Sequence, residues 1–283
     1  MKRRFDYWRR LGLSSKLLLK DLLRRRVTVL MLFIVPALFD LVVLATTAER
    51  EDPIVLGILP DERIEMIDRR ALSFVFLGVA AVGFLTSFLA FYLVHRRTET
   101  DRRLALCGFR PDEIIAAKLA VLLVIVAVIT VYEGLIIRPF FEPRHFGWVL
   151  AGLFLGGLVY ACYGLLVGAI SVHELEGIFL IVLVANIDVG WLQNPIYYRE
   201  STHRLVIKSL PGYFPTQLAS IGAFTDKFFM ITIWGSLAYA GAFLLAALAA
   251  FWLRIRIRGF VQKGFPNLDK PQPNKHQPRM SAN

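Results

Sequence analysis

Three acidic residues stand inside long apolar runs of this sequence, where an ionisable side chain is costly and usually serves a function. Asp188 lies about eleven residues into the fifth run, near its middle, and Asp40 and Glu133 lie nearer one end of the first and third runs. We expect these acids to be the candidates for a reactive or ion-coupling group. The ordinary alternative, a carboxylate bonded to a neighbouring helix or facing a water-filled cavity, stays open for each.

Other catalytic chemistry has no signature here. The sequence contains no Gly-Lys dipeptide and therefore no P-loop, and it has no Gly-x-Ser-x-Gly elbow. Its five histidines never pair at metal-ligand spacing, and Cys107 and Cys162 lie 55 residues apart, which excludes a disulfide framework or a Cys-x-x-Cys site. We expect no catalytic residue, no metal site and no cofactor on this chain, and hence no enzyme activity of its own.

The most polar stretch in the middle of the chain, RRTETDRRLALCGFRPDEIIAAK (96–118), lies between two apolar runs. Nothing breaks the helix that enters it until Gly108, a natural helix stop. Pro111 suits the first position of a new helix, and Asp112 and Glu113 place negative charge at its positive end. The stretch predicts two helices that protrude from the membrane and join in a tight turn at 108–110. A plain solvated hairpin is the alternative.

Six apolar runs must position these features: 27–47, 71–94, 118–137, 148–172, 178–192 and 228–253. Each approaches the roughly 20 residues that cross a bilayer, and a chain of 283 residues that is 56% hydrophobic cannot bury six such helices as a soluble protein. We therefore predict an all-α, polytopic membrane protein with six transmembrane helices over 27–253. The spacings Gly152-x-x-x-Gly156 and Gly164-x-x-x-Gly168 predict close helix packing in the fourth span.

The distribution of positive charge predicts the orientation. Twenty-three Lys and Arg residues fall in 1–26, 95–118 and 254–283, against ten in the alternate segments. By the positive-inside rule, both termini and segment 96–118 face the cytoplasm, and the basicity reflects topology and anionic lipid, with no nucleic-acid partner. Arg69 and Arg70, at an outer boundary, fit this orientation least well.

Three segments lie outside the spans. In 1–26, Leu11, Ser15, Leu18, Leu19 and Leu22 share one helical face and Lys16, Lys20 and Arg24 the other, which predicts an amphipathic interfacial helix; a merely basic flank is the alternative. The proline-rich tail predicts disorder over 254–283. The outer segment 193–227 contains an apolar stretch, 215–224, that is too short to cross, which predicts re-entrant outer helices.

Together these features resemble the type-2 ABC transporter permeases over about residues 11 to 258. The resemblance rests on LLLKDLLRRRVTVLMLFIVPALF, with basic residues before the first span and a proline within it, on VGAISVHELEGIFL between spans four and five, and on SLPGYFP at the outer side. It departs from the family where Glu99 precedes Thr100 and where Gly108 replaces a proline of the turn. The resemblance marks a coupling surface for an ATPase subunit at Glu99, Thr100, Leu104, Gly108, Phe109, Arg110, Glu113 and Glu174.

The resemblance implies a mechanism. Two permease copies, or two related chains, would enclose a path in the plasma membrane, and a dimer of soluble ABC ATPase subunits, which carry the ATP and Mg, would drive alternating access through the coupling hairpin. Export is the usual direction. A standalone ion-coupled transporter that uses Asp188, or a membrane anchor without transport, are the alternatives, and the sequence does not identify a substrate.

Overall fold

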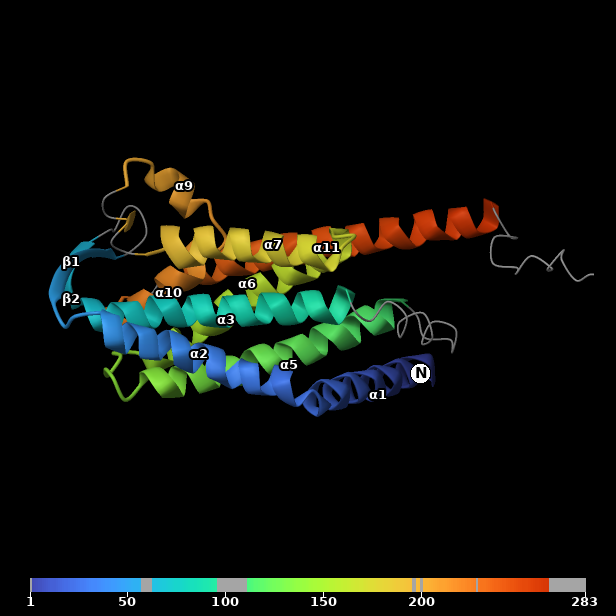
Figure 1. Ribbon diagram of the computed structural model, residues 1–283, viewed down its shortest axis with the longest axis horizontal. Helices are drawn as coiled ribbons and strands as arrows, with labels where there is room; N and C mark the ends of the chain where they lie inside the picture. The colour runs from blue at the N-terminus through green and yellow to red at the C-terminus, as the bar shows by residue number, and fades with distance from the viewer. Residues whose placement is uncertain are drawn as a thin grey trace, which may run out of the picture.

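The chain folds into a bundle of long helices (Figure 1). The computed structural model describes residues 2–56, 63–95, 111–194, 197–198, 201–227 and 229–264. Within these residues, six helices are long and apolar enough to cross a membrane, as predicted, which makes this a multi-pass membrane protein. In chain order the elements are α1 (Lys2–Arg24), α2 (Arg26–Thr46), β1 (Glu51–Leu56), β2 (Arg63–Asp68), α3 (Arg69–His95), α5 (Pro111–Ile137), α6 (Phe146–Ile170), α7 (Glu174–Ala185), η1 (Asn186–Leu192), α9 (Arg204–Lys208), α10 (Tyr213–Phe224) and α11 (Met230–Gly264). The fifth span is α7 together with η1, a π-helical segment.

Helices α3 and α6 form the centre of the bundle. Of the residues in the spanning part of each, 78% are buried, against 17–28% for α2, α7 and α11. The predicted glycine spacings lie at these contacts: a Cβ on Gly164 would collide with the carbonyl of Ser87 on α3, and one on Gly152 would lie 2.6 Å from the backbone nitrogen of Ala219 on α10. Glycine lets the helices approach backbone to backbone, so the prediction of close packing in the fourth span is confirmed.

The predicted amphipathic helix exists as α1, which packs against α5 and α2. On its predicted apolar face, Leu18 and Leu22 are buried and Leu11, Ser15 and Leu19 are partly buried, whereas Lys16, Lys20 and Arg24 are exposed. Because the apolar face meets α5, the helix is a docked part of the bundle.

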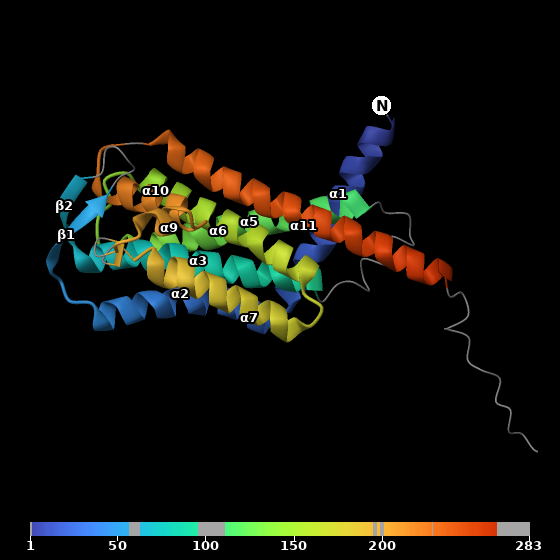
Figure 2. The ribbon, with the colours of Figure 1, turned by 90° about the horizontal axis from the view of Figure 1, so that it is seen from above.

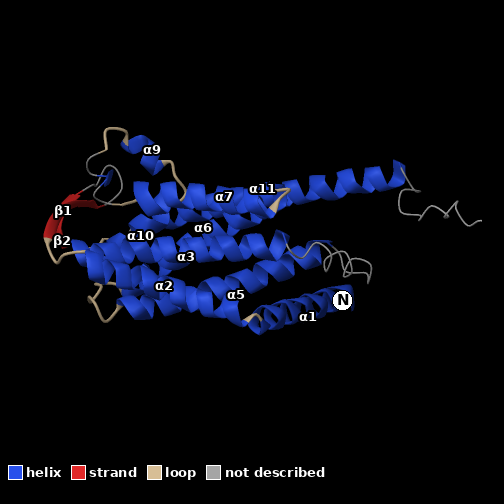
Figure 3. Ribbon diagram, in the orientation of Figure 1, coloured by secondary structure: helices blue, strands red, loops and turns tan. Residues whose placement is uncertain are grey.

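Two short strands, β1 and β2, form an antiparallel ribbon at one end of the bundle, here named the strand end (Figure 3). The N-terminus and the C-terminal end of α11 lie at the opposite end, named the N-terminal end (Figure 1). The ribbon was not predicted, and it adds a small β element to the expected all-α fold. Its apolar side, Ile54, Leu56 and Ile67, packs with Leu72 of α3 and Phe224 of α10.

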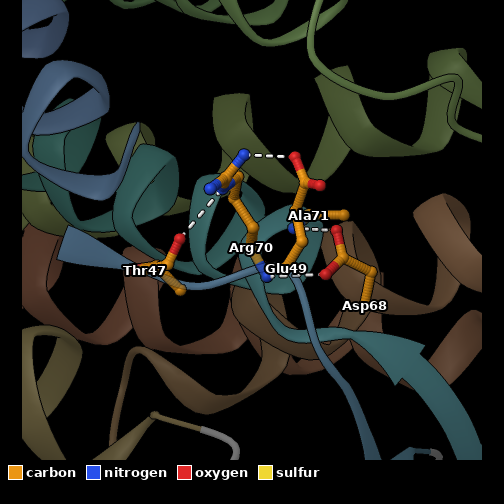
Figure 4. A network of polar contacts seen from close by, with 5 residues as sticks. All are labelled: Thr47, Glu49, Asp68, Arg70 and Ala71. Atoms are coloured by element: carbon orange, nitrogen blue, oxygen red, sulfur yellow. Dashed lines mark hydrogen bonds and ion pairs between the residues drawn. The ribbon is translucent and has the colours of Figure 1, made fainter. Parts of the chain in front are cut away.

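Arg70, which together with Arg69 fitted the predicted orientation least well, is engaged in polar contacts at the strand end (Figure 4). Arg70 donates from Nε to the carbonyl of Thr47 over 2.9 Å and pairs with Glu49. Asp68 accepts the backbone N–H groups of Arg70 and Ala71, each over 3.2 Å, and so caps the first turn of α3. These partners explain how basic residues sit at this boundary.

Helix α10 is a short apolar helix between the fifth and sixth spans. Its twelve residues rise about 18 Å, too little to cross a membrane. It packs against α6, α3 and α11, and most of its side chains are buried. The loop between α5 and α6 is bonded to the end of α10, because Arg144 N and His145 N donate to the carbonyls of Ala223 and Gly222 over 3.0 and 2.9 Å. Figure 2 shows α10 beside α6 near the strand end.

One predicted helix start is confirmed and one predicted boundary changes. Helix α5 begins at Pro111, the predicted first position of the helix that leads into the third span. Helix α11 continues to Gly264, so the first eleven residues of the tail predicted as disordered, 254–264, are helical. Residues 265–283 of that tail lie outside the described residues.

Candidate functional site

All three candidate acids are buried in the helical bundle. Asp40 is 3% exposed, Glu133 0% and Asp188 1%. Their surroundings differ: Asp188 is surrounded by hydrogen-bond donors, whereas the carboxylate oxygens of Asp40 and Glu133 have no hydrogen-bond partner in the described part of the chain. The same residue type therefore has two distinct environments in one bundle.

Asp188 joins three parts of the chain. Its Oδ2 accepts the hydroxyl of Tyr160 on α6 and the backbone N–H of Gly212, the latter over 2.8 Å. Its Oδ1 accepts the Nε2 of Gln193 over 2.9 Å, and Gln193 also donates to the carbonyl of Ile207 over 3.3 Å. A carboxylate with three donors is well stabilised in a buried site. Asp188 thus fixes η1 to α6 and to the turn that begins α10.

Gly212 makes this arrangement possible. A Cβ at this position would lie 2.9 and 3.0 Å from the two carboxylate oxygens of Asp188. Without a side chain, the backbone N–H can approach the acid directly. The π-helical turns of η1 carry Asp188 at this point, and such turns recur where a helix must present a particular side chain. The sequence left open that Asp188 is a carboxylate bonded to a neighbouring helix, and the structure shows this arrangement.

Asp40 and Glu133 are 93 residues apart in the chain, and the packing of their helices brings them into the same part of the bundle. Asp40 lies on α2 and Glu133 on α5, and Val43 and Ile137, one turn further along the same two helices, pack in one cluster with Phe74 of α3. Gly78 of α3 makes room for them, since a Cβ there would lie 2.9 Å from Glu133 Oε1. The three helices pack against one another, so the acids form a pair, here called the acid pair, enclosed by α2, α3 and α5.

The predicted coupling surface is described only at its edges. Glu99, Thr100, Leu104, Gly108, Phe109 and Arg110 lie outside the described residues. Glu113 lies in the first turn of α5 and is 3% exposed, so its side chain is covered in this structure. Glu174, in the first turn of α7, is exposed at the N-terminal end. Of the two described residues, Glu174 is the one available to a separate subunit.

Several residues that build these sites have no signal of their own in the sequence. Tyr160 and Gln193 are partners of Asp188, and Gly78 makes room for Glu133. Tyr160 lies in an apolar run that any aromatic residue fits, and Gly78 resembles other small residues of its span. Asp188 and Gln193 are five residues apart, a spacing that does not share one face of an α-helix, and the π-helical turns of η1 bring them together.

No group of three or more His, Cys, Asp or Glu side chains that could hold a metal ion occurs among the described residues. The acid pair therefore stands as two carboxylates without a third acidic, His or Cys ligand in the part of the chain described. No protein-family model matches the sequence, and no curated protein matches it either.

Proposed function

We propose that this protein is the membrane permease subunit of an ATP-driven exporter of the type-2 ABC class. One observation carries the proposal: the two ends of the bundle hold different elements, as we expect of a transporter that is driven from one side of the membrane. The N-terminal end holds α1 and the ends of α3 and α5, which flank the charged segment 96–110. The strand end holds α10, a short buried helix between the fifth and sixth spans.

The packing supports a route for mechanical work. Segment 96–110 is continuous with α3, the helix whose contact with α6 is the most extensive in the bundle. A subunit that pushed on this segment would therefore act on the centre of the bundle. Helix α1 lies against α5 at the same end, so it would move with that helix. In this proposal the N-terminal end, with both termini, faces the cytoplasm of the plasma membrane.

The outer helices suit a partner in the membrane. The spans of α2, α7 and α11 are buried over only 22, 28 and 17% of their residues, so large apolar faces are open to lipid or to another chain. We infer that a second copy or a related permease packs there and that the path for the substrate lies between the two chains. ATP and Mg would bind to the ATPase subunits.

The ion-coupled alternative that uses Asp188 has less support. Asp188 accepts three hydrogen bonds that hold η1, α6 and the turn before α10 together. Releasing or taking up an ion at this carboxylate would break contacts that define the local fold. Its geometry favours a structural role.

Reconstitution tests the proposal. The purified chain is combined in nanodiscs with the soluble ABC ATPase encoded beside its gene, and ATP hydrolysis is measured for each component and for the mixture. We expect the chain alone to hydrolyse no ATP and the mixture to form a stable complex with a changed turnover. Gly108→Val, at the predicted tip, should reduce both association and turnover, because a β-branched residue disfavours the left-handed helix stop.

Thr202→Val is the matched control, because it introduces the same side chain at an exposed position of the strand end. It should leave association and turnover unchanged. If the Gly108→Val complex forms and turns over like the wild type, segment 96–110 is a plain connection. If no complex forms with the wild-type chain, the permease assignment fails.

A further inference from the structure

We propose that Asp40 and Glu133 form an intramembrane site that binds a proton at one of its two carboxyl groups. All four of their oxygens are buried and lack a hydrogen-bond partner among the described residues. The site goes beyond the proposed function and does not depend on an ATPase. It would operate in this chain whatever drives transport.

Like charges at this place cannot both persist. An ionised carboxylate moved out of water carries a penalty of several kcal/mol unless it is paired or hydrogen-bonded, and a second carboxylate beside it adds repulsion. Asp40 and Glu133 lie on helices that pack together at this level, since Val43 and Ile137, one turn away from them, share one cluster. A proton bound at either carboxyl group removes one of the two buried charges.

Basic side chains at the strand end have partners of their own. Arg50 and Arg69 pair with Asp52 at 3.5 and 3.7 Å, and Arg70 pairs with Glu49 and donates to the carbonyl of Thr47. The guanidinium of Arg138, one turn beyond Glu133, lies 5.4 Å from the ring centre of Phe146. None of these contacts brings a positive charge to the acid pair, and a bound proton compensates it.

An apolar layer separates the acid pair from the strand end. Val43, Phe74 and Ile137 pack together, and each lies about one turn nearer that end than Asp40, Gly78 and Glu133 on the same three helices. All three are at most 2% exposed. The layer keeps water from the carboxyl groups, so a proton can exchange only when α2 moves away from α3 and α5.

Movement of α2 would start at one weak point and break one contact. Pro36 lies inside α2 and removes one backbone hydrogen bond of the preceding turn. In that turn the carbonyl of Phe33 accepts the hydroxyl of Tyr132 over 2.9 Å, a bond between α2 and α5 that such a movement would break. Tyr132 directly precedes Glu133 in the chain, and α3 contributes Gly78 and Phe74 to the site.

A proton fits this site better than a metal ion does. Hard cations take about six oxygen ligands or more, at least several of them from the protein when the site is dry. The described residues supply two carboxylates here and no third acidic side chain. A proton needs a single carboxylate oxygen.

Infrared spectroscopy of the purified full chain in nanodiscs at neutral pH tests the site. The wild type should show the carbonyl stretch of a protonated side-chain carboxyl group, and Asp40→Asn/Glu133→Gln should lose it. Asp21→Asn, an exposed carboxylate outside the spans, is the control and should leave the band unchanged. Carbon-13 labelling of aspartate or glutamate in the wild type should shift the band, which identifies it as a side-chain carboxyl band. Because Asp188 and Glu113 are also buried, the single variants Asp40→Asn and Glu133→Gln assign the band to this site if the double variant does not fold.

Two results would overturn the proposal. A spectrum in which the double variant retains the whole band, or in which neither label shifts a protonated carboxyl band in the wild type, means that both acids are ionised. Loss of the band on replacing potassium with sodium in the buffer, with no change of pH, would identify a sodium site instead.

Discussion

At the residue scale, hydrogen-bond partners separate the buried acids into two kinds. Asp188 accepts Tyr160, Gln193 and Gly212 and thereby holds three segments together. Asp40 and Glu133 are equally buried but have no such donors among the described residues. Burial alone therefore does not distinguish these acids, whereas the donors around each carboxylate do.

The Asp188 contacts predict a clear loss of stability for Asp188→Asn. The amide can accept at one atom only, so its NH₂ group must face either Gln193 Nε2 or the N–H of Gly212, both of which are donors. A buried donor without an acceptor costs about 1–3 kcal/mol. The melting temperature of the purified chain in nanodiscs should fall accordingly.

Tyr160→Phe provides the comparison for that measurement. It removes one donor to Asp188 and leaves the other two in place, so it should lower the melting temperature less than Asp188→Asn. Equal melting temperatures for Asp188→Asn and the wild type would show that these contacts do not stabilise the fold, and would restore Asp188 as a candidate coupling acid.

At the element scale, the helix contacts depend on glycines that face another backbone. Gly164→Ala should force α6 away from Ser87 of α3 and cost about 1–3 kcal/mol or more, because backbone atoms cannot move aside as a side chain can. Gly241→Ala, on α11 with nothing within 4 Å of the added Cβ, should be neutral or stabilise by up to about 1 kcal/mol. Thermal unfolding measures both, and a similar effect of the two would refute the close α3–α6 contact.

The docked face of α1 gives a second prediction at this scale. Leu22 is 1% exposed whereas its neighbour Leu23 is 59% exposed. Truncation of a buried leucine costs at least about 2 kcal/mol, so Leu22→Ala should speed hydrogen exchange of the α1 amides by about 30-fold. Leu23→Ala should change it little. If both variants exchange like the wild type, α1 is not held by this face.

Local pattern explains which elements the sequence could predict. The six spans and the face of α1 follow from runs and periodicity within one helix, so Leu18 and Leu22 were placed correctly. The β1–β2 ribbon was missed, because it depends on pairing across the turn and on Phe224 of α10. The acid pair was missed as a pair for the same reason: Asp40 and Glu133 meet only through the packing of α2 on α5.

At the scale of the whole molecule, the two ends of the bundle have different compositions. The strand end carries compensated charge, in which arginines meet Glu49, Asp52 and Asp226. The N-terminal end carries the excess of Lys and Arg counted in the sequence. This asymmetry is the physical basis for placing the N-terminal end, and with it any ATPase, on the cytoplasmic side.

Cysteine labelling in intact cells tests that orientation most directly. Glu51→Cys and Thr202→Cys, each in a Cys107→Ala background, place an exposed thiol at the strand end. Both should react with a membrane-impermeant maleimide from outside, whereas native Cys107 in the wild type should react only after the membrane is permeabilised. Labelling of Cys107 in intact cells, with the two strand-end thiols protected, would invert the protein and contradict a cytoplasmic coupling segment.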